Sequence, residues 1–530
     1  MFLIMSAAYI TSELESEFGT IPPSFLPLGN RRLFQHQIKL APKGAKVYLS
    51  IPETYRVSEY DTNWLKINNV NLLRIPKGLS LGASLMSALA LSDLASETPL
   101  HILFGDTLLT ELPSGNDLVT ISQVENSYDW AMVTHDHSYW LNTAEDREQL
   151  NSNNVVCGYF KFNQPRHLVK ALTMAHWDFI QSLNYYHEKH QLNAVETQEW
   201  LDFGHLNTYY SSKAKFTTQR AFNQLKINDK WIQKSSVKNN KIAAEANWFA
   251  TVPAPLRIYL PQYLGSSEVG NTLSYRLEYL YNTALNELYV FSDLPELVWQ
   301  RILTSCLEFI DECRMHQAVD DSHTNQLQDL FGNKTHQRLN EYCQSIQVQL
   351  NTPWTYNGNL SASFSDLLAK SEQYLSTENQ LGTVMHGDFC FSNILYDFRS
   401  NKVKTIDPRG IDLQGNLTIF GDTRYDLAKL SHSILGLYDW IIAGYYQVDI
   451  DYTNHHIQFD IQPSGGIAAI QTLFIEMIAE RYQLSANALY AMQIQLFLSM
   501  LPLHADDPKR QQALMANAFR LYLLIKDSTS

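Results

Sequence analysis

The sequence predicts an α/β domain over residues 1–216, followed by an α+β domain over residues 217–530. In the first half, short apolar runs of strand length alternate with helical stretches, which is typical of a layered α/β architecture. In the second half, a few strands of a small sheet precede a mostly helical region that runs to the end. At about 100–200 residues per domain, a chain of 530 residues is also too long for a single small fold. We place the boundary near Thr217–Thr218.

The elements of the first half follow from apolar runs of four to eight residues, the usual length of buried strands. The expected strands are FLIMSAAYI (2–10), KVYLSI (46–51), LHILFGD (100–106), WAMVTHD (130–136) and VVCGYFKF (155–162). Between the second and third of these, SLGASLMSALALSDLA (80–95) has the apolar spacing of a helix.

The second half begins with runs that predict a small sheet: FNQLKI (222–227), KWIQKSS (230–236) and SYRLEYLY (274–281). A long amphipathic helix is then expected over 294–316, and helices dominate from there on.

Composition narrows the class of protein. Hydrophobic residues make up 45% of the chain and charged residues 18%, which excludes wholesale disorder. The net charge of −14 disfavours binding to nucleic-acid phosphates. The five cysteines lack CxxC spacing, which argues against a disulfide framework and fits a reducing cytoplasm. No membrane span or signal peptide is expected, and the oligomeric state stays open. The expectation is a soluble cytoplasmic protein.

The most informative stretch is VMHGDFCFSNILYDFRSNKVKTIDPRG (384–410). It carries His386-Gly387-Asp388, then Asn393 at HGDxxxxN spacing, then a second strand that ends in Asp407. ATP-dependent phosphoryl transfer to a hydroxyl needs a carboxylate that orients the acceptor and accepts its proton. It also needs an amide oxygen and a second carboxylate on Mg²⁺. The order and spacing of these residue types predict that chemistry.

HGDxxxxN followed by IDP resembles the aminoglycoside phosphotransferase and choline kinase superfamily, and the later GDTRYDLAKL resembles its GDPxYDLA segment. The resemblance implies a bilobal protein-kinase-like fold that uses ATP and Mg²⁺. It implies that Asp388 is the catalytic base, that Asn393 and Asp407 hold Mg²⁺, and that His386 buttresses the loop, with Asp426 bracing it. A lone His-Gly-Asp could be a chance turn, but three linked elements in order argue against that.

A kinase N-lobe also needs a strand lysine on the phosphates, held by a helix glutamate. KWIQKSS supplies Lys234 and KIAAEANWF supplies Glu245, while Lys230 and Lys241 compete for the lysine role. The LEYLYNTAL segment resembles the hinge, where backbone groups near Glu278 and Leu280 would bind adenine. The turn between the first two strands lacks a Gly-rich loop, which disfavours a protein kinase more than a small-molecule kinase. No GxxxxGK[ST] occurs, so P-loop chemistry is excluded.

The first half resembles sugar-phosphate nucleotidyltransferases, which implies a Rossmann-like three-layer domain. FLPLGNRRLFQHQI fits the family's run after the first strand, and LHILFGDTLL resembles the strand that ends in a metal-binding Gly-Asp, giving Asp106. EWLDFGHLNTYYSSKAKF resembles the WxDxGTxxxY segment, giving Asp202 as the second metal carboxylate. The helix around Gly82–Ser87 lies where the family grips its base. The two aspartates could instead be strand-end caps.

This half departs from the family where triphosphate is bound. The family's GxGTR loop is replaced by TSELESEFG, and its lysine position falls on Ser24. Backbone N–H groups and cations normally hold the triphosphate there. Glu13, Glu15 and Glu17 would repel it.

We therefore expect a bifunctional enzyme that phosphorylates a small-molecule hydroxyl on a sugar, polyol or amino alcohol. A nucleotidyltransferase-like domain, using CTP or another nucleoside triphosphate, would then activate the product for capsule or lipopolysaccharide synthesis. Three alternatives stay open. The first domain could bind without catalysing, the whole chain could be a non-catalytic regulatory protein, or the kinase could act on antibiotics. The last would need a strongly acidic acceptor cleft.

Overall fold

The computed structural model describes residues 1–92, 98–123, 132–133, 141–142, 154–197, 199–220, 225–236, 239–319, 326–376, 378, 380–412, 414–463 and 466–525. Most of the strand expected over 130–136 lies outside these residues. The chain divides into two compact units. Unit 1 comprises Met1–Thr217 with Phe291–Asp293, and unit 2 comprises Thr218–Val290 and Leu294–Ser530.

Unit 1 is built on one mixed sheet, with strand order β10-β6-β9-β4-β1-β2-β3 and with β7 and β8 attached beside β9. Strands β1, β2, β3 and β4 pair in parallel, whereas β9 runs antiparallel to both β4 and β6. The strands are β1 (Phe2–Met5), β2 (Val47–Pro52), β3 (Val70–Ile75), β4 (Leu100–Phe104), β5 (Thr107–Leu109), β6 (Leu118–Gln123), β7 (Met132–Val133), β8 (Leu141–Asn142), β9 (Asn154–Phe162), β10 (Asn193–Glu196) and β11 (Trp200–Asp202).

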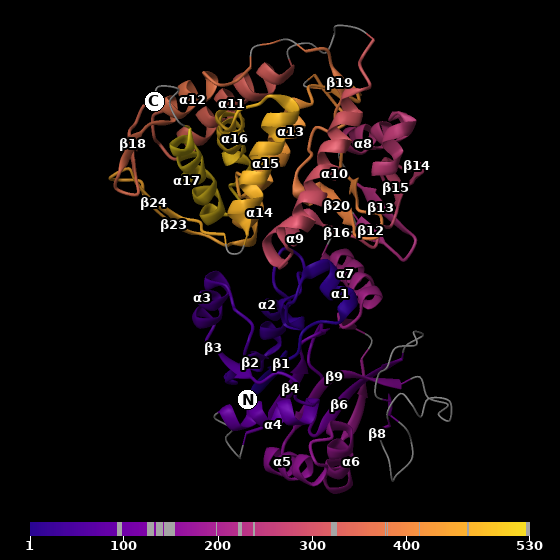
Figure 1. Cartoon of the computed structure of the whole chain (residues 1–530). Helices are drawn as coiled ribbons and strands as arrows, with labels where there is room; N and C mark the ends of the chain where they lie inside the picture. Colours follow the sequence, from indigo (N-terminus) through magenta and orange to yellow (C-terminus); the bar gives the residue numbers. More distant parts are fainter. Residues whose placement is uncertain are drawn as a thin grey trace. The chain divides into compact units, whose positions relative to one another are not determined.

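Helices cover both faces of this sheet, which confirms the three-layer α/β class. Alternate residues of β1, including Leu3 and Met5, join the buried core that α4, α5 and α6 cover, and α1 and α2 lie on the other face (Figure 1). The expected strand over 2–10 ends early, at Met5. The helices are α1 (Ser12–Phe18), α2 (Leu33–Gln37), α3 (Glu59–Ile67), α4 (Leu81–Leu91), α5 (Pro165–Met174), α6 (Phe179–His190) and α7 (Leu206–Arg220).

Unit 2 begins with a small antiparallel sheet of order β12-β13-β15-β14, against which one helix, α8 (Asn239–Thr251), packs. These are the elements of a kinase N-lobe. Its strands are β12 (Leu225–Ile227), β13 (Trp231–Ser235), β14 (Tyr263–Val269) and β15 (Thr272–Glu278). Within it, Lys234 of β13 lies opposite Tyr275 of β15.

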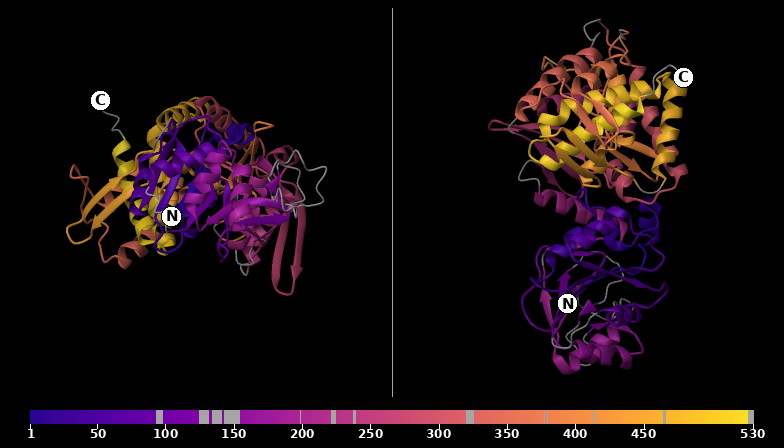
Figure 2. Two further views of the ribbon diagram at one scale, coloured as in Figure 1. Left: turned by 90° about the horizontal axis from the view of Figure 1, so that it is seen from below. Right: turned by 90° about the vertical axis from the view of Figure 1, so that its left-hand side faces the viewer.

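The rest of unit 2 is a mainly helical lobe, which confirms the bilobal α+β class. Helix α16 packs on α11, α12, α13 and α17. The later helices of this lobe are the gold to yellow ribbons in the two further views of Figure 2. The helices are α9 (Leu285–Phe291), α10 (Glu296–Arg314), α11 (Gln326–Ser345), α12 (Phe364–Glu372), α13 (Arg424–Ile434), α14 (Tyr438–Ala443), α15 (Ile467–Tyr482), α16 (Ala486–Met500) and α17 (Pro508–Leu524).

Short strands interrupt this helical lobe more than the sequence predicted. A three-stranded sheet, β16-β20-β21, and a two-stranded pair, β19-β22, frame the HGD loop, and a four-stranded sheet, β18-β17-β24-β23, lies elsewhere in the lobe. The strands are β16 (Thr283–Ala284), β17 (Trp354–Tyr356), β18 (Leu360–Ala362), β19 (Thr383–Val384), β20 (Ile394–Asp397), β21 (Lys402–Thr405), β22 (Phe420–Gly421), β23 (Gln447–Asp451) and β24 (His456–Asp460).

No single helix in the described part of the chain is long and apolar enough to cross a membrane. One bent helix pair, Ile467–Tyr482 with Ala486–His504, meets the length and composition criteria across a 107° break.

Candidate functional sites

The HGD loop of unit 2 joins β19 to β20 and is held from both sides. The Asp426 carboxylate accepts the backbone N–H groups of His386 (2.7 Å) and Gly387 (2.8 Å). The His386 Nε2 atom lies 2.9 Å from the Ile406 carbonyl oxygen, next to the second strand of the motif. Gly387 has φ +78°, a conformation that glycine adopts most easily. The bracing predicted for Asp426 and His386 is thus present as hydrogen bonds.

Burial sets the charge of both bracing groups. It lowers the pKa of His386 to about 4, so the ring is neutral at pH 7. It also raises the pKa of Asp426 to about 7, against the opposing effect of the two N–H groups. The neutral imidazole of His386 therefore stabilises the loop through its hydrogen bond with the Ile406 carbonyl oxygen.

Asp388 projects from this loop between an amide and an ammonium group. The Asn393 Nδ2 group donates to the Asp388 backbone oxygen (2.9 Å) and to its Oδ2 atom (3.0 Å). The Lys429 Nζ atom of α13 lies 2.8 Å from Oδ1. Burial alone would raise the pKa of Asp388, but Lys429 and Arg409 outweigh it and hold that pKa at about 2. Asp388 is fully ionised at neutral pH.

Lys234 contacts two carboxylates: Glu245, its predicted partner, and Asp407, which the sequence predicted as a Mg²⁺ ligand. Its Nζ atom lies 2.8 Å from Glu245 Oε2 and 2.9 Å from Asp407 Oδ1. Glu245 is buried and also accepts a hydrogen bond from the Tyr275 hydroxyl (2.6 Å). The competing Lys241 lies 3.7 Å from Glu245 with its side chain 65% exposed, and Lys230 lies exposed in the β12–β13 turn. The geometry selects Lys234.

The donors on this side of Asp388 fit Mg²⁺, which prefers oxygen ligands and near-octahedral geometry. Because the Asn393 Nδ2 group is turned to Asp388, its Oδ1 oxygen faces the other way. One Asp407 oxygen pairs with Lys234, and the side chain is 42% exposed. Among the described residues, no three His, Cys, Asp or Glu side chains gather to hold a metal ion. The remaining ligands would be phosphate oxygens and water, as is usual for Mg²⁺ in kinases.

Asp407 has φ +58°, a left-handed conformation that is uncommon for a residue with a side chain. Three residues later, Gly410 passes so close to α8 that a Cβ atom there would lie 2.2 Å from the Ala244 carbonyl oxygen. The loop that carries Asp407 is therefore fixed against the helix that carries Glu245.

Replacing Asp407 by Asn is expected to raise the Mg²⁺ concentration for half-maximal activity by at least about 10–100-fold, the range for losing even an outer-shell partner of a metal. Turnover should fall with it. Asn tolerates the left-handed conformation, so the loop should keep its shape. A Mg²⁺ titration of ATP turnover measures the effect, and an unchanged half-saturation point would contradict the metal role.

The two predicted hinge residues differ in whether their backbone is hydrogen-bonded. Glu278 ends β15 and its N–H donates to the Gln262 carbonyl oxygen (2.9 Å), so its backbone N–H is occupied. Leu280 lies just beyond the strand and makes no backbone hydrogen bond to any other described residue. Of the two, Leu280 has the backbone free for an adenine edge.

In unit 1, a two-stranded ribbon brings the predicted metal carboxylates together. Strand β11 pairs antiparallel with β5, so that Asp202 lies opposite Thr107, the neighbour of Asp106. A Cβ atom on Gly204 would lie 2.9 Å from Asp106 Oδ2 and 3.4 Å from Asp202 Oδ1. Only a residue without a side chain leaves room for both carboxylates.

The ionised form of both carboxylates is disfavoured in this position. Burial and the neighbouring Asp106 raise the pKa of Asp202 to about 7, and burial raises that of Asp106. The Asp202 Oδ2 atom is buried and has no hydrogen-bond partner among the residues that the structure describes. Two buried carboxylates with an oxygen left over fit a divalent cation better than a pair of strand-end caps.

The two carboxylates line a cavity of about 350 Å³. Its lining includes Thr11, Leu81, Phe104, Trp200 and His205, but no lysine or arginine among the described lining residues. The expected base-binding stretch Gly82–Ser87 does not line it. A Cβ atom on Gly82 would lie 2.2 Å from the Trp177 carbonyl oxygen. The first residue of this stretch therefore packs directly against the backbone of Trp177.

The segment that replaces the family's triphosphate loop forms helix α1. Glu13 and Glu15 are exposed, and the buried Glu17 accepts a hydrogen bond from the Tyr210 hydroxyl. Ser24 is fully buried, and its Oγ donates to the Gly105 carbonyl oxygen (3.2 Å). These residues hold unit 1 together and supply no cation for a triphosphate.

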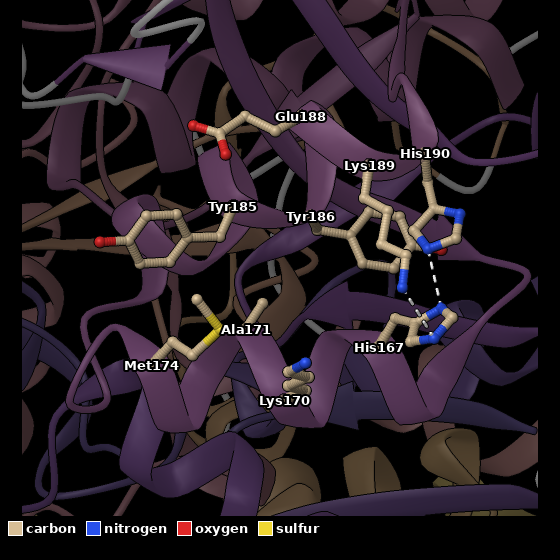
Figure 3. A pocket seen from close by; sticks show the side chains of 9 residues that line it. All are labelled: His167, Lys170, Ala171, Met174, Tyr185, Tyr186, Glu188, Lys189 and His190. Atoms are coloured by element: carbon tan, nitrogen blue, oxygen red, sulfur yellow. Dashed lines mark hydrogen bonds between the residues drawn. The ribbon is translucent and has the colours of Figure 1, made fainter.

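A second cavity in unit 1, of about 340 Å³, lies between α5 and α6 (Figure 3). There the rings of His167 and His190 stack with centroids 4.7 Å apart, and Lys189 points to His167. The charged residues Lys170, Glu188 and Lys189 on its rim are exposed. It shares no lining residue with the carboxylate cavity.

Sequence reasoning missed two cations beside Asp388. Lys429 lies within the GDTRYDLAKL segment, and its place on α13 turns it to the loop. Arg409 lies over the Tyr425 ring (4.5 Å), and its side chain fills the space where Gly387 would have a Cβ atom. The resemblance of GDTRYDLAKL to the family's segment drew attention to Asp426 on this helix, but nothing in the sequence singled out Lys429.

No protein-family model matches the sequence. No curated protein matches it either.

Solved structures match each part of the chain separately. A nucleoside-diphosphate-sugar pyrophosphorylase from Vibrio cholerae is similar over 40% of this chain and 99% of its own, at 14% identity and a TM-score of 0.33. An inositol-1-phosphate CTP transferase from T. maritima is similar over 41% and 95%, at 13% identity and a TM-score of 0.32. A thermostable mutant of the aminoglycoside phosphotransferase APH(4)-Ia is similar over 59% and 98%, at 14% identity and a TM-score of 0.35.

Proposed function

We propose that unit 2 transfers the γ-phosphoryl group of ATP to a hydroxyl group of a small molecule. The arrangement at Asp388 carries this proposal. An ionised carboxylate is fixed by Asn393 and Lys429. The Asn393 carbonyl oxygen accepts the N–H group of Ile406 (3.0 Å), whose neighbour Asp407 pairs with Lys234. Phosphoryl transfer depends on positioning and charge stabilisation more than on covalent chemistry, and these groups supply both.

In this reaction the acceptor hydroxyl donates a hydrogen bond to Asp388, which orients its oxygen towards the γ-phosphorus. The new O–P bond forms as the bond to the β,γ-bridging oxygen breaks, ADP leaves, and the hydroxyl proton passes to Asp388. With a pKa of about 2, Asp388 is a weak base. It therefore accepts the proton late, once bonding to phosphorus has made the hydroxyl acidic. Lys234 holds phosphate oxygens, and Mg²⁺ when bound offsets their charge.

For unit 1 we propose a second, metal-dependent activity, the transfer of a nucleotidyl group to a phosphorylated compound. The observation that favours it is the convergence of Asp106 and Asp202 beside Gly204. The absence of lysine and arginine from the described cavity lining predicts slow transfer, and it keeps the binding-only alternative for this unit. In the full proposal, unit 2 makes a phosphate ester and unit 1 activates it for cell-surface polysaccharide synthesis.

The test uses the full chain with Mg²⁺-ATP and a panel of alcohols, sugars and amino alcohols, with ADP release as the readout. We expect ADP release that depends on one class of acceptor. Absence of ATP turnover with every acceptor, and of slow hydrolysis without one, would refute the kinase proposal. Pyrophosphate release from CTP, UTP and dTTP with a labelled phosphate ester separates the catalytic and binding-only alternatives for unit 1.

A further inference from the structure

Three cationic side chains come from elements near Asp388. Lys429 contacts Asp388 directly, and Arg409 lies between Gly387 and the Tyr425 ring. A third cation, Lys334, comes from α11, which the Phe331–Tyr425 ring contact (5.4 Å) holds against the same tyrosine. Three elements distant in sequence therefore bring positive charge to one place.

The acidic groups nearby offset this charge only in part, although, against the effect of burial, Tyr425 and Asp388 raise the pKa of both Arg409 and Lys429. Asp388 is the ionised carboxylate that faces it. Asp426 is committed to the backbone N–H groups of His386 and Gly387. Burial raises the pKa of Asp426 and of Asp439 to about 7, so each is only partly ionised at neutral pH. Asp422, in the same segment as Asp426, is bound by Arg424 in a buried ion pair.

The pKa values of two neighbouring groups, Tyr425 and Lys334, are also lowered by these cations. Burial would raise the pKa of Tyr425, yet Arg409 and Lys429 lower it below its ordinary value. Burial lowers the pKa of Lys334, Tyr425 opposes this, and Arg409, Arg338 and Lys429 lower the pKa further. A half-buried lysine close to other cations is unfavourable unless an anion joins them.

We propose that the acceptor of this kinase carries a negatively charged group, a carboxylate or a phosphate, which Lys334 and Arg409 bind while its hydroxyl faces Asp388. This inference rests on the proposed phosphotransferase function and names its substrate class. It argues against cationic acceptors such as aminoglycosides or amino alcohols, which would meet like charges at this place. Neutral sugars would supply no anion for Lys334, whereas Lys429 already pairs with Asp388.

The first experiment measures binding without needing the natural acceptor. Malonate and 1,3-diaminopropane are three-carbon probes of opposite charge, and each is added to the full chain without Mg²⁺ at equal ionic strength. A bound ligand raises the melting temperature. We expect malonate to raise the temperature of the transition that ATP also shifts, by roughly 2–4 °C, and diaminopropane to leave it unchanged.

Two variants locate the effect. Lys334→Gln should abolish the malonate shift, whereas Lys509→Gln, an exposed lysine on α17, should keep it. A malonate shift that survives Lys334→Gln, a shift with diaminopropane alone, or no shift with either probe would overturn the proposal.

The second experiment compares matched acceptors: glucuronate, glucose and glucosamine, or glycerate and glycerol. We expect kcat/KM to be highest for the acidic member. Lys334→Gln should raise its KM by roughly 10–100-fold, the range for losing a charged hydrogen bond, without changing the KM for ATP. A preference for the amine or neutral member would overturn the proposal. If ATP is never turned over, the phosphotransferase function itself fails, whatever the malonate result.

Discussion

Asp388→Ala is expected to lower the kcat for phosphorylation by about 10²–10⁴-fold, the range for removing a positioned general base, with ATP binding almost unchanged. The side chain orients the acceptor hydroxyl and makes none of the contacts of the Lys234–Glu245–Asp407 group. Steady-state ADP release and an ATP binding titration measure the two quantities separately.

Asp388→Asn refines this test because it keeps the shape of the side chain and removes only its charge. It should lose nearly as much activity as Asp388→Ala. Glu476→Ala, at an exposed position on α15, serves as the control and should behave as wild type. An unchanged kcat in Asp388→Ala would show that another group receives the proton.

Asp106→Ala is expected to abolish nucleotidyl transfer by unit 1, with a loss of at least about 10³-fold, because one carboxylate alone holds a divalent cation poorly. Phosphorylation by unit 2 should persist. The variant should melt no lower than wild type without Mg²⁺, since the substitution removes one of two mutually repelling buried carboxylates. Pyrophosphate release, ADP release and thermal melting of one preparation give all three results.

The outcomes at Asp106 separate three readings of unit 1. If wild type releases no pyrophosphate with any nucleoside triphosphate while ADP release continues, unit 1 binds without catalysing. If Asp106→Ala stops phosphorylation as well, both readings fail and the two activities depend on one site. Loss of pyrophosphate release alone supports the catalytic reading.

For unit 2, the sequence predicted the residues that are close along the chain. Asp388, Asn393 and Asp407 belong to one strand-loop-strand segment, so linear spacing fixes their relation. Lys234 and Glu245 could be paired from the sequence because they lie on consecutive elements, a strand and the helix that follows it. Lys334 could not be foreseen, because α11 reaches Tyr425 only through tertiary packing.

For unit 1, spacing again predicted the carboxylate pair but not its surroundings. Asp106 lies just after β4, a strand of the parallel part of the main sheet, and Asp202 ends β11, which pairs antiparallel with β5. The burial of Ser24 and Glu17 depends on long-range partners, Gly105 and Tyr210, which no local pattern reveals. The short strands of the C-terminal lobe were missed for a related reason. Runs of three to five residues carry too little periodicity to be distinguished from loops.

The left-handed backbone at Asp407 has a consequence for how this protein can diverge. That conformation costs most side chains about 1–2 kcal/mol per residue, and only Gly, Asn and Asp visit it routinely. Substitution at this position therefore favours Gly, Asn and Asp, and two of these three amino acids lack the charge. A descendant with a β-branched residue such as valine there would pay that conformational cost in a loop that is packed against α8. If the proposed phosphotransferase activity is present, the amino acid aligned with Asp407 marks which descendants could have retained it.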